Sequence, residues 1–122
     1  MEDKKLATVL SARRDKYGPF INNATISQDL KEILHKSTNW EAMPPDMKEA
    51  LHMIVHKISR IVEGDFEYDD SWIDISGYST RVVERLHQLE QLKVNQEFTH
   101  LASMQSSGIV SPMRQAPEKN NS

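Results

Sequence analysis

An apolar stripe in the middle of the chain, bounded by two helix-end signals, constrains the fold more than any other feature of the sequence. Pro44-Pro45 opens this segment, because the first turn of a helix tolerates proline, and Gly64 closes it. Between these signals apolar residues recur at the spacing of one helix face: Leu51, Ile54, Val55, Ile58 and Val62. The spacing predicts an amphipathic helix. Its opposite face carries mostly polar side chains: Glu49, His52, Met53, His56, Lys57 and Arg60.

The same periodicity predicts three further helices, over about 3–16, 23–36 and 69–100, and no strand. The turn Tyr17-Gly18-Pro19 separates the first two, because proline cannot continue a helix. The fourth is expected to form a hairpin with the central helix and to bury Trp72 and Ile58 between them. Its core-facing set is expected to be Trp72, Ile75, Val82, Val83, Leu86 and Leu89. The fold class is therefore all-α, a four-helix domain with an acidic loop in the helical hairpin.

The composition divides the chain into a helical domain, residues 1–102, and a polar tail, residues 103–122. The tail is rich in Ser, Gly, Gln, Asn and Pro and lacks helical periodicity. It is therefore expected to be disordered and mobile, because it cannot bury enough apolar surface to offset the entropy of ordering. The total of 122 residues suits one domain.

Composition also excludes several classes of function. The chain has no cysteine, which excludes disulfides, a thiol nucleophile and cysteine-based metal centres. The net charge of -3 argues against generic nucleic-acid binding, which needs clustered positive charge. No long apolar run or signal-like segment is present, so we expect a soluble protein with no membrane contact, located in the cytoplasm.

The charges are unevenly distributed along the chain. Residues 61–80 carry six acidic side chains and no basic one, whereas residues 1–20 carry five basic side chains against three acidic ones. Clustered carboxylates repel one another, so they either remain in water or are neutralised by a cation or by basic side chains. Both alternatives are open at this point.

Asp70 and Asp74 lie one helical turn apart, a spacing at which two carboxylates can share one divalent cation. Hairpin packing would bring Glu49 toward them as a third carboxylate. Alternatively, Asp70 caps the helix and Asp74 favours its positive end. Gly77 extends the same face, where a ligand or a neighbouring backbone approaches closely, or it has no role beyond packing.

Basic and aromatic residues suggest a phosphate-binding surface. Arg13, Arg14 and Lys16 can clamp phosphates while Tyr17 or Phe20 stacks on a base. Alternatively, these bases only favour a helix C-terminus and the aromatic rings seal the core. In the central helix, Lys57 and Arg60 either pair with the acidic side chains or bind the phosphates of a nucleotide. His52 and His56 in the same helix have the spacing of a two-histidine metal site, or they are ordinary surface histidines.

Four segments occur in order along the chain: Arg13-x-x-x-Tyr17-Gly18-x-Phe20, Glu49-Ala50-Leu51-x-Met53-Ile54-x-x-Lys57-Ile58-x-Arg60-Ile61, Gly64-Asp65 and Asp70-Ser71-Trp72-x-Asp74-Ile75-x-Gly77-Tyr78. Over about residues 6–86 this pattern resembles a family of small bacteriophage and prophage proteins. More distantly, the pattern is similar to the all-α nucleoside-triphosphate pyrophosphohydrolases of the MazG-like type. That resemblance implies that Glu49, Asp70 and Asp74 bind Mg²⁺ or Mn²⁺ and serve catalysis, with Lys57 on the phosphates. The chain departs from the Glu-Glu-x-x-Glu of those enzymes, because Ala50 follows Glu49.

Two functions are expected from these observations. The first is a phage nucleotide-handling protein that acts as a Mg²⁺-dependent hydrolase similar to the nucleoside-triphosphate pyrophosphohydrolases. Its metal-binding and catalytic residues would be Glu49, Asp70 and Asp74, and its substrate-binding residues Lys57, Arg60, Arg13 and Tyr17. The alternative is a non-enzymatic helical protein that sequesters a nucleotide or inhibits a host defence protein. Either is expected to act in the host cytoplasm as a homodimer, since an all-helical chain of this size often completes its core by pairing.

Overall fold

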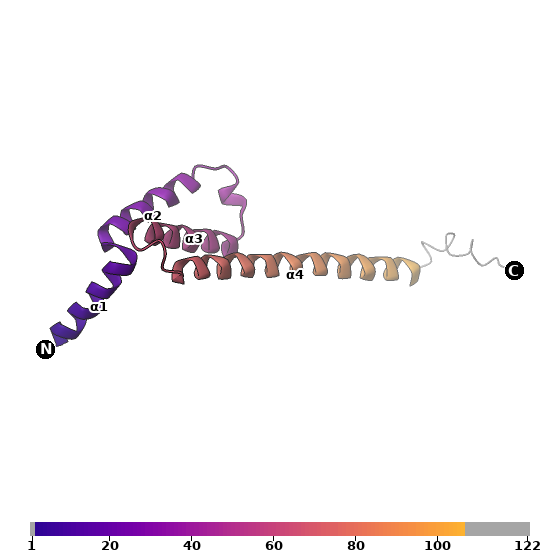
Figure 1. Cartoon of the computed structure of the whole chain (residues 1–122). Coiled ribbons are helices and arrows are strands. Elements are labelled where there is room, and N and C mark those ends of the chain that lie inside the picture. The colour runs from indigo at the N-terminus through magenta and orange to yellow at the C-terminus, as the bar shows by residue number, and fades with distance from the viewer. Residues whose placement is uncertain (1, 107–122) are drawn as a thin grey trace. The chain divides into compact units, whose positions relative to one another are not determined.

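The computed structural model describes residues 2–106, and all of its regular elements are helices (Figure 1). They are α1 (Glu2–Tyr17), α2 (Phe20–Leu34), the short 3₁₀ helix η1 (Trp40–Ala42), α3 (Pro45–Glu63) and α4 (Asp70–Ser106). No strand occurs in this described part, so the predicted all-α class is confirmed. The fourth helix runs six residues past the predicted end near His100. The rest of the predicted tail, from residue 107 on, lies outside the described residues.

The described residues fall into two units, which divide between Val83 and Glu84. The first contains α1, α2, α3 and the first turns of α4. The described part of the second is the remainder of α4, which exposes apolar side chains: Leu86, Leu92, Phe98 and Leu101. None of the described helices is both long and apolar enough to cross a bilayer.

The core of the first unit lies where α2 packs against α3 (Figure 1). Its buried apolar side chains come from η1 and α3: Trp40, Ala50, Val55 and Ile61. Small polar residues let the helices approach closely. One of them, Ser59, is fully buried, and its hydroxyl donates a hydrogen bond of 2.6 Å to the carbonyl oxygen of His56. Because α3 has neighbours on more than one side, several of its polar side chains are also half-buried, among them His56, Lys57 and Arg60.

The predicted core face of α4 is wrong in part. Trp72 is 54% exposed and Ile58 is 37% exposed, so neither is buried in a hairpin between α3 and α4. The more buried face of α4 instead follows the helical spacing Ser71, Asp74, Ile75, Tyr78 and Val82. The physical reason is that α4 meets α3 through the ion pair of Asp74 with Lys57, so its most apolar face is not its most buried face.

Candidate functional site

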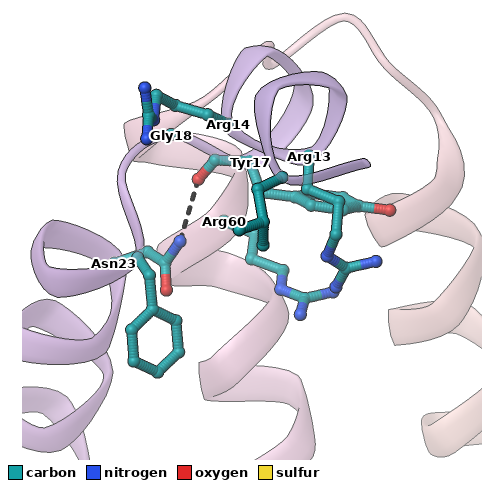
Figure 2. Close-up of a pocket in the computed structure, with 8 residues that line it drawn as sticks. Arg13, Arg14, Tyr17, Gly18, Asn23 and Arg60 are labelled. Atoms are coloured by element: carbon teal, nitrogen blue, oxygen red, sulfur yellow. Dashed lines mark hydrogen bonds between the residues drawn. The ribbon is translucent and has the colours of Figure 1, made fainter. Parts of the chain in front are cut away.

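A pocket of about 310 Å³ lies where α1 ends and α2 begins, against α3 (Figure 2). We call it the arginine pocket, and its lining residues are Leu10, Arg13, Arg14, Tyr17, Gly18, Phe20, Asn23 and Arg60. Arg13 and Arg14 precede the C-terminus of α1 by one turn, whereas Arg60 comes from the last turn of α3. Residues far apart in the sequence therefore converge on one site.

Two glycines allow the backbones around the pocket to approach closely. Gly18 ends α1 with φ +81°, a left-handed conformation that favours glycine, and an added Cβ would overlap the carbonyl oxygen of Glu63. An added Cβ on Gly64 would overlap the carbonyl oxygen of Lys16. The amide of Asp65 donates to that same carbonyl at 2.9 Å. The end of α1 is thereby held against the end of α3.

Tyr17 forms one wall of the arginine pocket. The guanidinium carbon of Arg60 lies 4.3 Å from the centroid of its ring, and that of Arg13 lies 5.2 Å from it. Both distances suit a cation–π interaction. The Tyr17 hydroxyl donates to Oδ2 of Asp70 at 3.2 Å. Burial, followed by the nearby negative charge of Asp70, raises the pKa of Tyr17 above its usual value, so the hydroxyl stays protonated at neutral pH.

Asn23 holds the turn that shapes the pocket. It is only 4% exposed, and its Nδ2 donates to the carbonyl oxygen of Tyr17 at 3.1 Å (Figure 2). This hydrogen bond satisfies one of the carbonyls left open at the end of α1. The sequence analysis did not identify Asn23, because a polar residue near the start of a helix is common and matches no binding motif. The feature that could have indicated its role is a polar side chain soon after the Gly18-Pro19 turn, where it can bond to an open carbonyl of the preceding helix.

The electrostatic character of the pocket is strongly positive. No acidic side chain lines it, and within residues 2–106 none of its three arginines forms an ion pair. A guanidinium group is always protonated at physiological pH and presents a planar fork of donors. Three such groups around one cavity favour a ligand with several negatively charged oxygens. The lining offers no nucleophile or general base, so the pocket by itself is suited to binding.

The predicted substrate-binding residues divide into two groups in the structure. Arg13, Tyr17 and Arg60 come together in the arginine pocket. Lys57 does not join them, because its ammonium lies 2.8 Å from Oδ2 of Asp74. Lys16 also lies outside the lining, with its ammonium 4.9 Å from the ring centroid of Tyr68.

The predicted metal ligands do not form a converged cluster. Asp70 accepts the Tyr17 hydrogen bond, Asp74 pairs with Lys57, and Glu49 is exposed on α3. Among the residues that the structure describes, no group of three or more His, Cys, Asp or Glu side chains could hold a metal ion. This arrangement of donors does not fit a Mg²⁺ site, and the metal and catalytic roles of Glu49, Asp70 and Asp74 remain predictions. The structure also places nothing described within 4 Å of a Cβ added to Gly77.

Comparison with known proteins yields one match. Residues 3–86 match the model of a family described as a domain of unknown function, DUF6378. No curated protein and no solved structure matches the chain. The matched range includes every residue of the arginine pocket, the Lys57–Asp74 ion pair and residues 70–86 of α4.

Proposed function

The chain belongs to this DUF6378 family, whose function is unknown, and we propose that it binds a nucleotide or a similar phosphate-bearing small molecule in the arginine pocket. The observation that carries the proposal is a set of three guanidinium groups around one cavity, from Arg13, Arg14 and Arg60, which have no carboxylate partner among residues 2–106. Guanidinium groups bind phosphate oxygens in a bidentate geometry, through charge-assisted hydrogen bonds that are stronger than neutral ones.

Two further features support a nucleotide rather than free phosphate. The volume of about 310 Å³ falls at the lower end of small-molecule sites, which typically measure about 300 to 1,000 Å³, and it exceeds the needs of a single phosphate. Phe20 lines the pocket with 77% of its surface exposed. An exposed aromatic ring beside a positive pocket offers a stacking surface for a base.

Hydrolysis of the bound nucleotide is a second candidate function. It is favoured by the hydrogen bond from Tyr17 to Asp70, which places a carboxylate beside the wall of the pocket. The similarity of the Asp70 to Tyr78 motif to MazG-like pyrophosphohydrolases points the same way. Because the described donors do not converge on a metal, binding without turnover is the function that the geometry supports better.

The experiment is a binding series on the full chain with ATP, dATP, tripolyphosphate and adenosine, each in EDTA and in Mg²⁺. Calorimetry should show binding of the phosphate-bearing ligands and none of adenosine, and affinity should fall as salt rises. Arg14→Ala and Arg60→Ala should each weaken binding about tenfold or more. Lys16→Ala is the matched control, since it removes an equal charge from the same helix end outside the lining. Absence of binding by any phosphate ligand, or equal loss in the control, would refute the proposal.

The same samples separate binding from hydrolysis. Release of pyrophosphate only when Mg²⁺ or Mn²⁺ is present would establish the enzyme, and Asp70→Asn should abolish that release while nucleotide binding persists. Binding without any product would establish the sequestering protein. A phage origin, inhibition of a host protein and a cytoplasmic location remain predictions that this series does not address.

We also propose that the chain forms a homodimer. Leu6, Val9 and Leu10 lie on one stripe of α1 and are each about half exposed, which leaves an apolar face uncovered in the described structure. Burial of such a face in a second copy would be favourable by about 25 cal/mol per Å². Light scattering should give twice the chain mass for the wild type, and Val9→Asp should yield monomers while Ala7→Asp does not. A monomeric wild type would contradict the dimer.

A further inference from the structure

Two histidine rings meet at the opposite end of the α2–α3 pair from the arginine pocket. His35 follows the last residue of α2, and His52 lies in the second turn of α3. Their Nε2 atoms are 2.8 Å apart. Trp40 of η1 lies against both rings, with centroid distances of 4.8 Å to His35 and 5.1 Å to His52. We call these three residues the histidine pair and its tryptophan.

The environment holds the two nitrogens in place while leaving them accessible. Trp40 is 7% exposed and belongs to the core, so its ring is a fixed wall for both imidazoles. The contact between the two nitrogens is exposed to solvent. Neutral imidazole carries one lone pair on an unprotonated ring nitrogen, and two such lone pairs cannot face each other without a proton or a cation between them. In the metal-free chain one ring is therefore the Nε2–H tautomer and donates to the unprotonated Nε2 of the other ring, and a metal ion would replace that proton once the donor ring shifts to its Nδ1–H tautomer.

We propose that His35 and His52 form a binding site for a divalent transition-metal ion of the Cu²⁺ or Ni²⁺ class. Imidazole nitrogens are preferred ligands of these ions. Metal–nitrogen bonds of about 2.0 to 2.1 Å, with the nitrogens 2.8 Å apart, subtend an angle of about 90° at the metal. That angle matches adjacent positions of square-planar or octahedral coordination. A tetrahedral Zn²⁺ site would need the two nitrogens to move apart.

The local charges are compatible with such an ion. Burial first, then the positive charge of Lys31, lowers the pKa of His52, whereas the nearby charge of Glu49 acts in the opposite direction. The described residues supply no third protein ligand, so water would complete the coordination.

The test is titration of the full chain, stripped with EDTA, with Cu²⁺, Ni²⁺, Zn²⁺ and Mg²⁺ alone. Calorimetry should show one equivalent of Cu²⁺ bound more tightly than Ni²⁺, weaker Zn²⁺ and no Mg²⁺. The electron paramagnetic resonance spectrum of the Cu²⁺ form should show hyperfine coupling to two nitrogens. His35→Ala and His52→Ala should each weaken binding about tenfold or more.

His56→Ala and His87→Ala are the matched controls, because both are described histidines outside the pair. Circular dichroism of each variant would confirm that it is folded. Undiminished Cu²⁺ affinity in the His35→Ala/His52→Ala double variant, or coupling to a single nitrogen, would overturn the proposal. A wild type that binds no Cu²⁺ would show that the pair shares only a proton. None of these results depends on the arginine pocket, so the two proposals can fail separately.

Discussion

The ammonium of Lys57 lies 2.8 Å from Oδ2 of Asp74, and this ion pair joins the middle of α3 to the first turns of α4. The side chain of Lys57 is only 12% exposed, whereas that of Asp74 is 36% exposed. Asp74 therefore neutralises a largely buried cation. The sequence left open whether Asp74 would hold a metal or pair with a base, and in this structure it pairs with a base.

Replacing Asp74 with Asn should lower the free energy of unfolding by about 0.5 to 1 kcal/mol, because the pair is partly exposed and screened by solvent. Urea denaturation of Asp74→Asn, Lys57→Met and the double variant would give the coupling energy. The loss should occur in EDTA and shrink at high salt. An Asn variant more stable than the wild type in EDTA would instead indicate repulsion between Asp70 and Asp74, as expected of an empty metal site.

The two tryptophans should respond differently to truncation. Trp40 is 7% exposed in the core, so Trp40→Ala should cost about 3 to 5 kcal/mol and largely unfold the protein. Trp72 is 54% exposed, and its Nε1 donates to the carbonyl oxygen of Phe66 at 3.0 Å. Trp72→Ala should cost only about 1 kcal/mol. Thermal denaturation followed by circular dichroism distinguishes the two, and equal losses would contradict the observed burial.

Replacing glycine with alanine should destabilise the protein at two positions and stabilise it at a third. Gly18→Ala and Gly64→Ala should each destabilise, because the added Cβ would overlap backbone atoms of α3 or α1. Gly77→Ala should stabilise by up to about 1 kcal/mol, because it lies within α4 with open space around it. Denaturant midpoints would report the signs. A destabilising Gly77→Ala would point to a ligand or second copy near that position.

Stability should fall as the pH is lowered through the titration of His56. Burial first, then the positive charges of Arg60, Lys57 and Lys31, lower the pKa of His56 below its usual value near 6.5. The unfolded chain therefore binds this proton more readily than the folded chain. The stabilising contribution is complete above about pH 6.5 and is lost as the pH falls toward the folded-state value. Urea midpoints from pH 8 to 5 should decline less steeply for His56→Gln than for the wild type, and parallel curves would contradict this assignment.

Deprotonation of Tyr17 should lower the free energy of unfolding in the alkaline range. Its pKa is raised in the folded state, first by burial and then by Asp70, so the folded chain holds this proton more tightly than the unfolded chain. Its contribution is present below about pH 10 and is lost as the pH rises through the folded-state value. Tyr17→Phe should cost about 0.5 to 1.5 kcal/mol at pH 7 through the lost hydrogen bond to Asp70. Denaturation at pH 9 to 11 should show a shallower decline for the variant, and an identical decline would place the titrating group elsewhere.

The local physics of the chain was sufficient to predict its four α-helices, although α2 begins at Phe20 rather than near residue 23 and the 3₁₀ helix η1 was not predicted. Pro45 begins α3 and Gly64 follows its end, as the proline and glycine signals indicated. Half of the arginine pocket was also predictable, because Arg13 and Tyr17 are one helical turn apart and share a face of any helix that contains them. These features depend on backbone geometry and on residues close together in the sequence, so no knowledge of packing is needed to predict them.

Which surfaces and charges meet depends on packing between residues that are distant in the sequence. Arg60 joins Arg13 across the pocket because two glycines let the ends of α1 and α3 approach. Ser71 rather than Trp72 is buried, and the ion pair of Asp74 with Lys57 joins that side of α4 to α3. Hydrophobic periodicity identifies an apolar face, but the complementary surface determines which face is covered. A carboxylate likewise pairs with whichever cation packing brings within reach, and sequence spacing alone does not contain that information.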